Sequence, residues 1–196
     1  AAHCVAGAAP SEISAFAGVT NLGERSNQNL VSVSGVVINP SWNANTFSGD
    51  IALLQLAVPL TFSPTVQPIS LPTAQDPGVW PAGGTAAQIS GWGSTSYGGT
   101  ASDALLAATV SVLGGPSDTG CGSYGGSFRS SESICAGVPE MGIDTCQGDS
   151  GGPLVVTADT GPVLAGVTSV GNECALPNFP GIYTRATSFL PWINQY

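Results

Sequence analysis

The sequence predicts an all-β protein. Its apolar stretches are short and are separated by turn-forming residues, with 27 glycines and 15 prolines in 196 residues. Charged residues make up only 8% of the chain, against roughly 25% in ordinary domains, so Ser, Thr, Asn and Gly are expected to cover the surface. No apolar run approaches the roughly 18 residues that a membrane-spanning helix needs. The length suffices for one or two units with a core of their own.

Strands are expected where apolar residues alternate or run together. In the first half of the chain these segments are 13–19, 30–38 and 51–56, and a polar loop at 21–29 separates the first two. A carboxylate, Asp50, directly precedes the third strand.

The middle of the chain is rich in proline. Six prolines between 59 and 81 indicate an irregular connector, because proline interrupts both helices and strands. Strands are expected again at 86–92 and 105–113, with a Gly/Ser/Tyr loop at 93–100 between them. The last residues, 187–196, mix large apolar and polar side chains and predict a short packing helix.

One stretch has the features of a nucleophile site. Ser150 is flanked by Gly148, Gly151 and Gly152, so the backbone can turn sharply and a substrate can approach closely. The amides of Gly148 and Ser150 could then stabilise the oxyanion that forms when a carbonyl is attacked. Gly-Asp-Ser-Gly-Gly-Pro is also ordinary turn chemistry, so partners for the serine are needed.

The chain offers both partners that a nucleophilic serine needs. His3 is the only histidine, and it is the only side chain that could serve as a base near neutral pH. Asp50 is a candidate for the acid that orients it. Taken singly, a histidine is often a core residue and an aspartate before a strand is often part of a turn.

Five motifs together make the chain resemble the trypsin-like branch of the chymotrypsin family of serine endopeptidases, of the peptidase S1 type. They stand in the family's order: Ala-Ala-His-Cys at 1–4, Asp-Ile-Ala-Leu-Leu at 50–54, Ser-Gly-Trp-Gly at 90–93, Gly-Asp-Ser-Gly-Gly-Pro at 148–153 and Pro-Gly-Ile-Tyr-Thr at 180–184. The resemblance implies two antiparallel six-stranded Greek-key barrels, the first one truncated. The expected divisions are an N-terminal barrel at 1–72, a connector at 73–85, and a C-terminal barrel with its helix at 86–196.

The resemblance also implies a catalytic triad of His3, Asp50 and Ser150. His3 would take the proton of Ser150 and return it to the leaving amine, while Asp50 holds the imidazole tautomer. A non-catalytic protease homologue that serves as a binding module is the main alternative. A lipase or esterase is a third possibility, although those enzymes favour a different serine motif.

Specificity is expected to depend on the segment between 144 and 183. By resemblance, Asp144 lies at the base of the primary pocket, where a carboxylate favours an arginine or lysine side chain. The other residues expected to bind substrate are Thr145 and Gln147, the edge segment Ser169, Val170 and Gly171, the pocket residues Gly181 and Tyr183, and Phe47 beside the scissile bond. A tryptophan is usual in the family where Val170 stands, so recognition of residues upstream of the cut is expected to be weaker.

The chain begins inside the histidine motif, without methionine or a signal peptide. We therefore expect a fragment that lacks the early strands of the first barrel. By resemblance, Asp149 receives the free amino terminus that inserts when the zymogen is activated. Because a buried carboxylate without its partner costs on the order of 3 to 5 kcal/mol or becomes neutral, the fragment is expected to be inactive or misfolded.

Five cysteines are an odd number, and spacing alone does not give their pairing. The family pattern implies the bridges Cys121–Cys135 and Cys146–Cys174 and leaves Cys4 to pair with a cysteine outside the chain. Zinc is the competing use, but no close Cys-x-x-Cys pair is present. Disulfides indicate an oxidising compartment, so we expect a secreted, extracellular protein.

The formal net charge is −9, with 12 carboxylates against three arginines and no lysine. Nucleic acid and anionic membranes are therefore poor partners, whereas basic substrates are favoured. No cofactor is expected, and no metal either, because the 21–29 loop offers calcium only Glu24. The expected partners are protein or peptide substrates with Arg or Lys at the cleaved residue, together with protein protease inhibitors, and the expected state is a monomer.

Overall fold

The structure is a computed structural model that describes residues 1–73, 80–114, 119–138 and 142–196. Its first half contains a three-stranded antiparallel sheet in the order β1-β2-β3. The strands are β1 (Ser14–Phe16), β2 (Leu30–Ile38) and β3 (Ala52–Leu56). Along β2 the buried Val31 and Val33 alternate with exposed neighbours, as expected for a strand with one face on a core.

The second half forms a closed six-stranded barrel in the order β4-β5-β6-β9-β8-β7, with antiparallel neighbours throughout. Its strands are β4 (Ala86–Gly91), β5 (Leu106–Val112), β6 (Ser133–Gly137), β7 (Pro153–Ala158), β8 (Gly161–Val170) and β9 (Gly181–Arg185). Small and branched apolar side chains fill the barrel, among them the fully buried Ile134 and Leu154. The prediction of an all-β chain with a six-stranded C-terminal barrel is confirmed.

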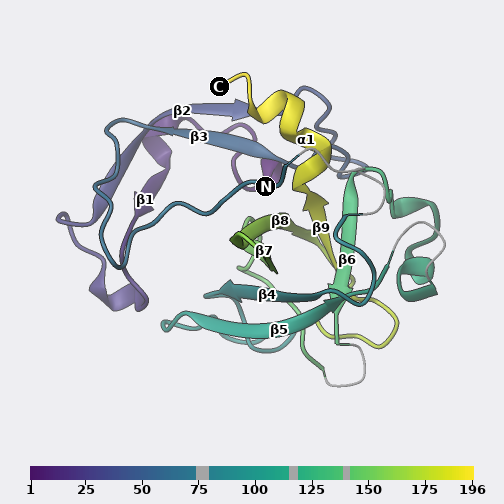
Figure 1. The fold of residues 1–196 in the computed structure, drawn as a ribbon. Helices are drawn as coiled ribbons and strands as arrows, with labels where there is room; N and C mark the ends of the chain where they lie inside the picture. Colours follow the sequence, from purple (N-terminus) through teal and green to yellow (C-terminus); the bar gives the residue numbers. More distant parts are fainter. Residues whose placement is uncertain (74–79, 115–118, 139–141) are drawn as a thin grey trace.

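One α-helix, α1 (Ala186–Ile193), follows directly after β9. Its Phe189 and Trp192 pack against Ile51 of the first half in a small core cluster. Figure 1 accordingly shows α1 beside β2 and β3. The predicted C-terminal helix is confirmed, and it ties the last element of the barrel to the first sheet.

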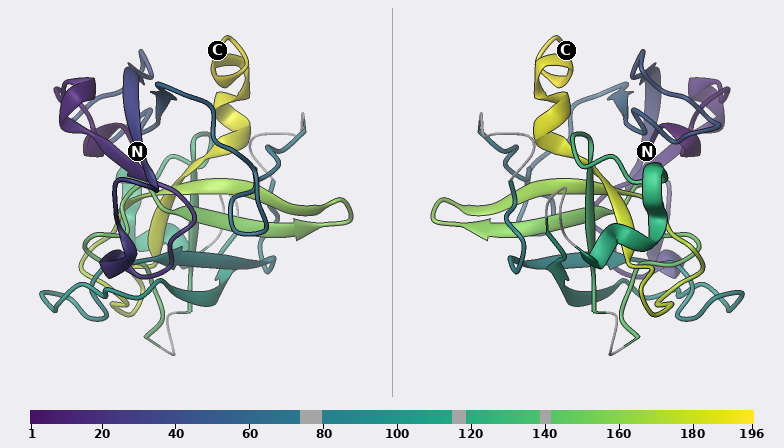
Figure 2. Two further views of the ribbon diagram at one scale, coloured as in Figure 1. Left: turned by 90° about the vertical axis from the view of Figure 1, so that its left-hand side faces the viewer. Right: turned by 90° about the vertical axis from the view of Figure 1, so that its right-hand side faces the viewer.

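In the described part of the chain, 3₁₀ helices lie at η1 (Ala2–Cys4), η2 (Pro10–Glu12), η3 (Leu22–Glu24) and η4 (Thr119–Ser127), the last with a kink at Gly125. The first of them begins at the amino terminus, between the first sheet and the barrel (Figures 1 and 2). A Cβ added at Gly151 would lie 3.4 Å from the Ala1 nitrogen, so η1 lies beside the turn that carries Ser150.

The division at 1–72, 73–85 and 86–196 stays a prediction, and residues 74–79 of the expected connector lie outside the described residues. None of the helices in the described part of the chain combines the length and the apolar character needed to cross a bilayer.

Candidate active site

His3 and Asp50, which are 47 positions apart, are in direct contact. The Nδ1 atom of His3 lies 2.7 Å from Oδ2 of Asp50. The backbone N–H of His3 donates to the other carboxylate oxygen, Oδ1, at 2.8 Å. Because both oxygens of Asp50 bind the same residue, the imidazole ring is fixed in orientation.

The barrel holds Asp50 from its other side. The carboxylate is buried, with 1% of the residue exposed, and its Oδ2 accepts a 2.6 Å hydrogen bond from the Ser169 hydroxyl of β8. The hydroxyl of Thr184 in β9 donates to the backbone carbonyl of Asp50 at 2.7 Å. Asp50 thus belongs to the first half of the chain but is held by residues of the second.

These contacts shift the pKa values of both partners. Burial alone would raise the pKa of Asp50, but the hydrogen bonds from His3 and Ser169 hold it below its usual value. The hydrogen bond to Asp50, with a second one to Cys4, raises the pKa of His3 from 6.5 to about 9. The site therefore stabilises an imidazolium next to a carboxylate.

The second nitrogen of His3 faces a thiol. Its Nε2 lies 3.6 Å from Sγ of Cys4, a free and exposed cysteine, and this contact lowers the pKa of the thiol. Within the described residues no hydrogen bond joins His3 to Ser150.

Ser150 lies in the turn that leads into β7. Gly148 and Gly151, on either side of it, have φ angles of 96° and 84°, which favour glycine. The Gly151 amide donates to the Thr168 carbonyl at 2.9 Å and fastens the turn to β8. The amides of Gly148 and Ser150 donate to no other described residue, so both N–H groups are available to an oxyanion.

A cavity of about 200 Å³ lies beside Ser150. Five residues that the sequence predicts to bind substrate line it: Thr145, Gln147, Ser169, Val170 and Gly171. Glu173, which the sequence analysis did not single out, also lines this cavity.

Asp144 lines a second and larger cavity, of about 450 Å³, that does not include Ser150. Its carboxylate accepts the amides of Thr145 at 2.8 Å and Ala175 at 3.1 Å, and also that of Gly181. Burial nevertheless raises its pKa above the usual value. Thr145 and its neighbour Cys146 line both cavities.

Tyr183 and Gly181 line neither cavity. The Tyr183 side chain is fully buried in the barrel core, which raises its pKa, and its hydroxyl lies 3.2 Å from Oγ1 of Thr145. From there it supports the Thr145 side chain rather than facing solvent.

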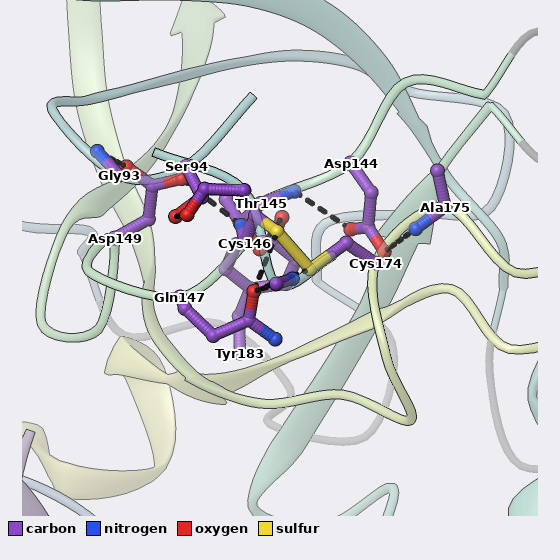
Figure 3. The surroundings of a disulfide bond; sticks show 12 residues. Gly93, Ser94, Asp144, Thr145, Cys146, Gln147, Asp149, Cys174, Ala175 and Tyr183 are labelled. Atoms are coloured by element: carbon purple, nitrogen blue, oxygen red, sulfur yellow. Dashed lines mark hydrogen bonds between the residues drawn. A yellow bond between two sulfur atoms is a disulfide. The ribbon is translucent and has the colours of Figure 1, made fainter. Parts of the chain in front are cut away.

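Asp149 also lines the larger cavity, where its carboxylate accepts the amides of Gly93 at 2.8 Å and Cys146 at 3.0 Å. Figure 3 shows Asp144 and Asp149 with the Cys146–Cys174 disulfide between them. A second disulfide joins Cys121 to Cys135. Among the described residues, no group of three or more potential metal ligands is present.

Phe47 contacts the site through the His3 ring. Its ring lies edge-on to that of His3, with the centroids 5.7 Å apart, and 40% of the residue is exposed. It lines neither of the two cavities.

Comparison with known proteins gives the family. The family model described as Trypsin matches residues 1–193. The chain belongs to the trypsin family. It is 42% identical to a protein named Trypsin from Saccharopolyspora erythraea, over 96% of this chain and 77% of that protein. It is 37% identical to Trypsin-1 of Astacus astacus, over 99% of this chain and 81% of that protein.

A third relative is a much longer protein. The chain is 41% identical over its whole length to Transmembrane protease serine 9 of Rattus norvegicus, and the match covers 18% of that protein. With the family model, these relatives make the chain a trypsin-like serine endopeptidase.

Sequence reasoning missed two carboxylates that contact the site of this trypsin-family chain. Glu173 stands two residues after Gly171, the last residue of the predicted edge segment, so its position in the sequence was a usable signal. Glu132 bonds to Ser48 and Gly49, just before Asp50, across more than 80 positions of sequence. No local pattern could have shown that contact.

Proposed function

We propose that the chain hydrolyses peptide bonds after Arg or Lys, with Ser150 as nucleophile, His3 as base and Asp50 as the group that orients it. The observation that carries the proposal is the 2.7 Å contact between Nδ1 of His3 and the buried carboxylate of Asp50. A carboxylate in that position keeps Nε2 available to act as a base. Ser150 supplies the other requirement, an exposed hydroxyl at a glycine-flanked turn.

The reaction then has two halves. His3 Nε2 takes the proton of Ser150 as Oγ attacks the peptide carbonyl, and the amides of Gly148 and Ser150 donate to the oxyanion. The C–N bond breaks, the amine leaves with the proton from His3, and an acyl ester remains on Ser150. Water, deprotonated by His3, attacks the ester carbonyl. The bond between the acyl carbon and Oγ breaks, His3 returns the proton to Oγ of Ser150, and the peptide acid leaves.

This route requires Nε2 of His3 to leave Cys4 and face Ser150. Hydrogen bonds between a nucleophile and its base are often long in free enzymes and tighten only with substrate. We expect substrate binding to bring about this rearrangement.

The preference for Arg or Lys rests on Asp144. Three backbone amides fix its carboxylate, and burial raises its pKa, so a cationic side chain would stabilise its charged form. A substrate side chain would enter beside Ser150 and reach Asp144 past Thr145, which lines both cavities. Gly171 lines the smaller cavity, and a Cβ at Gly181 would lie 2.7 Å from Oδ1 of Asp144, so glycine at both positions would leave that path open. Gln147 and Val170 would contact the substrate from the rim.

Asp149 is proposed to act in activation. It lines the larger cavity, where an ammonium group could replace its present backbone partners, Gly93 and Cys146. The chain is expected to be inactive until such a group binds, as in a zymogen.

The two disulfides support a secreted protein, and protein protease inhibitors are the expected partners besides substrates.

The alternative is a non-catalytic binding module. The contact between His3 Nε2 and Cys4 favours it, because no hydrogen bond joins His3 to Ser150 within the described residues.

The proposal is tested with peptides that differ only in having Arg, Phe or Ala at the cleaved residue. The protein is used in a form whose free amino group can bind Asp149. Cleavage after Arg that is lost in Ser150→Ala, and loss of the Arg preference in Asp144→Asn, are the expected results. No turnover and no labelling by a serine-directed covalent probe, in a folded protein, would favour the binding module. Turnover without an Arg preference would reject only the role of Asp144 in specificity and would leave the proposed triad in place.

A further inference from the structure

The loop that carries Phe47 has a strained backbone next to the proposed base. Phe47 has a φ of 52°, in the left-handed region that a bulky residue rarely adopts. Such residues persist only where their surroundings over-determine the backbone, and they gather at functional sites. The contacts that hold Phe47 are therefore informative about function.

Two charged residues of the barrel half hold the loop on both sides of Phe47. Arg129 donates from Nη1 to the Thr46 carbonyl at 3.1 Å, immediately before Phe47. Glu132 accepts from the Ser48 hydroxyl at 3.0 Å and from the Gly49 amide at 2.9 Å, immediately after it.

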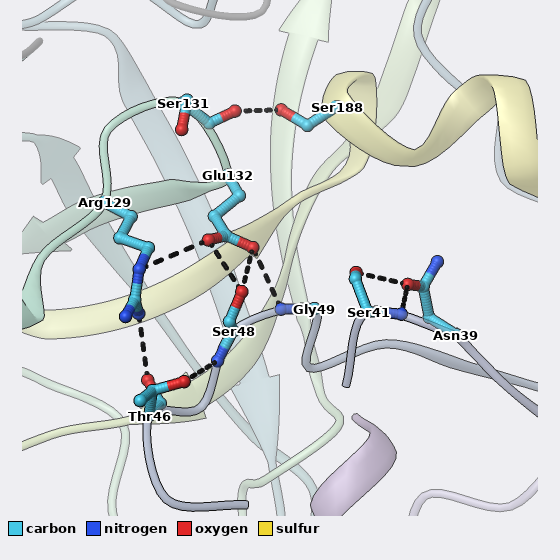
Figure 4. Close-up of polar contacts among 9 residues, drawn as sticks. All are labelled: Asn39, Ser41, Thr46, Ser48, Gly49, Arg129, Ser131, Glu132 and Ser188. Carbon is cyan, nitrogen blue, oxygen red and sulfur yellow. Dashed lines mark hydrogen bonds and ion pairs between the residues drawn. The ribbon is translucent and has the colours of Figure 1, made fainter. Parts of the chain in front are cut away.

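Arg129 and Glu132 also pair with each other, with Nε of Arg129 3.6 Å from Oε1 of Glu132. Figure 4 shows this pair facing Thr46, Ser48 and Gly49, and we call the pair the barrel clamp. The side chains are 35% and 20% exposed, so both are partly shielded from solvent. Arg129 is one of only three arginines in a chain that has no lysine.

The far end of the loop packs so closely against Ser41 that only glycine fits at position 49. Gly49 has a φ of 62°, and a Cβ added there would lie 2.4 Å from Oγ of Ser41. Phe47 is also packed edge-on against Trp42, with ring centroids 5.5 Å apart. The clamp is thus the part of the surroundings that comes from the other half of the chain.

We propose that the barrel clamp positions Phe47 and so determines which side chain a substrate can carry immediately before the cleaved residue. The inference rests on the proposed function, which puts the scissile bond beside His3 and Ser150. Phe47 stands 5.7 Å from the His3 ring, so a shift of the loop changes the space open to that substrate side chain. Arg129 and Glu132 are positioning residues, because they act through Phe47 and touch no reacting atom.

The test uses two peptide substrates, both with Arg at the cleaved residue, that carry either Gly or Leu immediately before it. In Glu132→Ala the ratio of kcat/KM between the two substrates should change by about 3- to 10-fold, mainly through KM. The pH midpoint of kcat/KM should stay where it is, because Asp50 and His3 keep their mutual contacts. Glu24→Ala removes an exposed carboxylate far from the clamp and should leave the ratio unchanged.

A double-mutant cycle separates positioning from general loosening. In the Phe47→Ala background, Glu132→Ala should no longer change the ratio, because the side chain that the clamp positions is gone. An equal loss on both substrates, or the same change in ratio with and without Phe47, would overturn the proposal. Failure of the parent protein to cleave after Arg would instead reject the proposed function.

Discussion

His3 is contacted on both of its ring nitrogens, by Asp50 on Nδ1 and by Cys4 on Nε2. Both contacts favour the imidazolium, and together they raise the pKa of His3 to about 9. A general base must be neutral, so the proposed mechanism draws on the form that these contacts disfavour. The thiol of Cys4 thereby affects the step that starts the reaction.

We predict that kcat/KM rises with pH through about 9, as His3 loses its proton. Cys4→Ala should move the midpoint to lower pH, because the hydrogen bond from His3 to the thiol raises the pKa of the imidazole. Initial rates on one Arg peptide across pH measure both midpoints. Cys4→Ser keeps a weaker hydrogen-bond partner for His3, so its pH midpoint should lie between those of the parent protein and Cys4→Ala. A midpoint that stays in place or rises in Cys4→Ala would contradict the prediction.

At the level of single residues, the sequence could go only part of the way. Asp50 and His3 could be named because the family motifs mark them, but their 2.7 Å contact spans 47 positions that no local pattern bridges. The Ser169 hydroxyl was expected at the substrate edge, and its bond to Asp50 depends on how two halves of the chain meet. Such contacts are set by tertiary packing.

At the level of elements, the barrel strands supply most of the buried apolar surface. Leu154 in β7 is fully buried, whereas Leu106 in β5 is 46% exposed. Leu154→Ala should lower the free energy of unfolding by about 2–5 kcal/mol, because it leaves a cavity in a closed barrel. Urea unfolding with the disulfides intact measures this change. Leu106→Ala is the matched control, and an equal loss in both variants would show that burial does not decide the effect.

The strand ranges predicted from the sequence match the structure in part. The segment 30–38 was predicted as a strand and is β2, since Leu, Val and Ile dominate it. The predicted strand at 13–19 is shorter in the structure, Ser14–Phe16, because Gly18 has a φ of 77° and ends the extended run. No strand range was predicted for β6, β7, β8 or β9, and only the family resemblance implied them. In β6, Ser133–Gly137, small residues predominate, and Ser, Cys, Ala and Gly form weak strands until a barrel buries them.

At the scale of the whole molecule, little positive charge is left to offset 12 carboxylates. Arg185 is buried, where it donates to the carbonyls of Trp80 and Ser133. Arg129 pairs with Glu132, and Arg25 lies over the ring of Phe16 at 5.7 Å. The surface should therefore attract cationic peptides before any specific contact forms.

For a substrate with several basic residues, kcat/KM should fall several-fold as ionic strength rises from about 0.01 M to about 0.15 M, because the Debye length shrinks from about 30 to about 8 Å. A peptide with the same cleaved residue but neutral flanks should change much less. Initial rates at low substrate concentration give both values. Equal salt dependence for the two peptides would mean that the overall charge does not steer substrates.

The hydrogen bonds from Ser169 of β8 and Thr184 of β9 to Asp50 have a consequence for biosynthesis. A ribosome makes His3 and Asp50 before it makes Ser169, Thr184 and the helix α1 that packs against Ile51. A nascent chain can therefore carry all three residues of the proposed triad while Asp50 still lacks the contacts that fix it. The geometry of the proposed triad can therefore form only after β8 and β9 have been synthesised, so during synthesis its completion is delayed until well after His3 and Asp50 themselves are made.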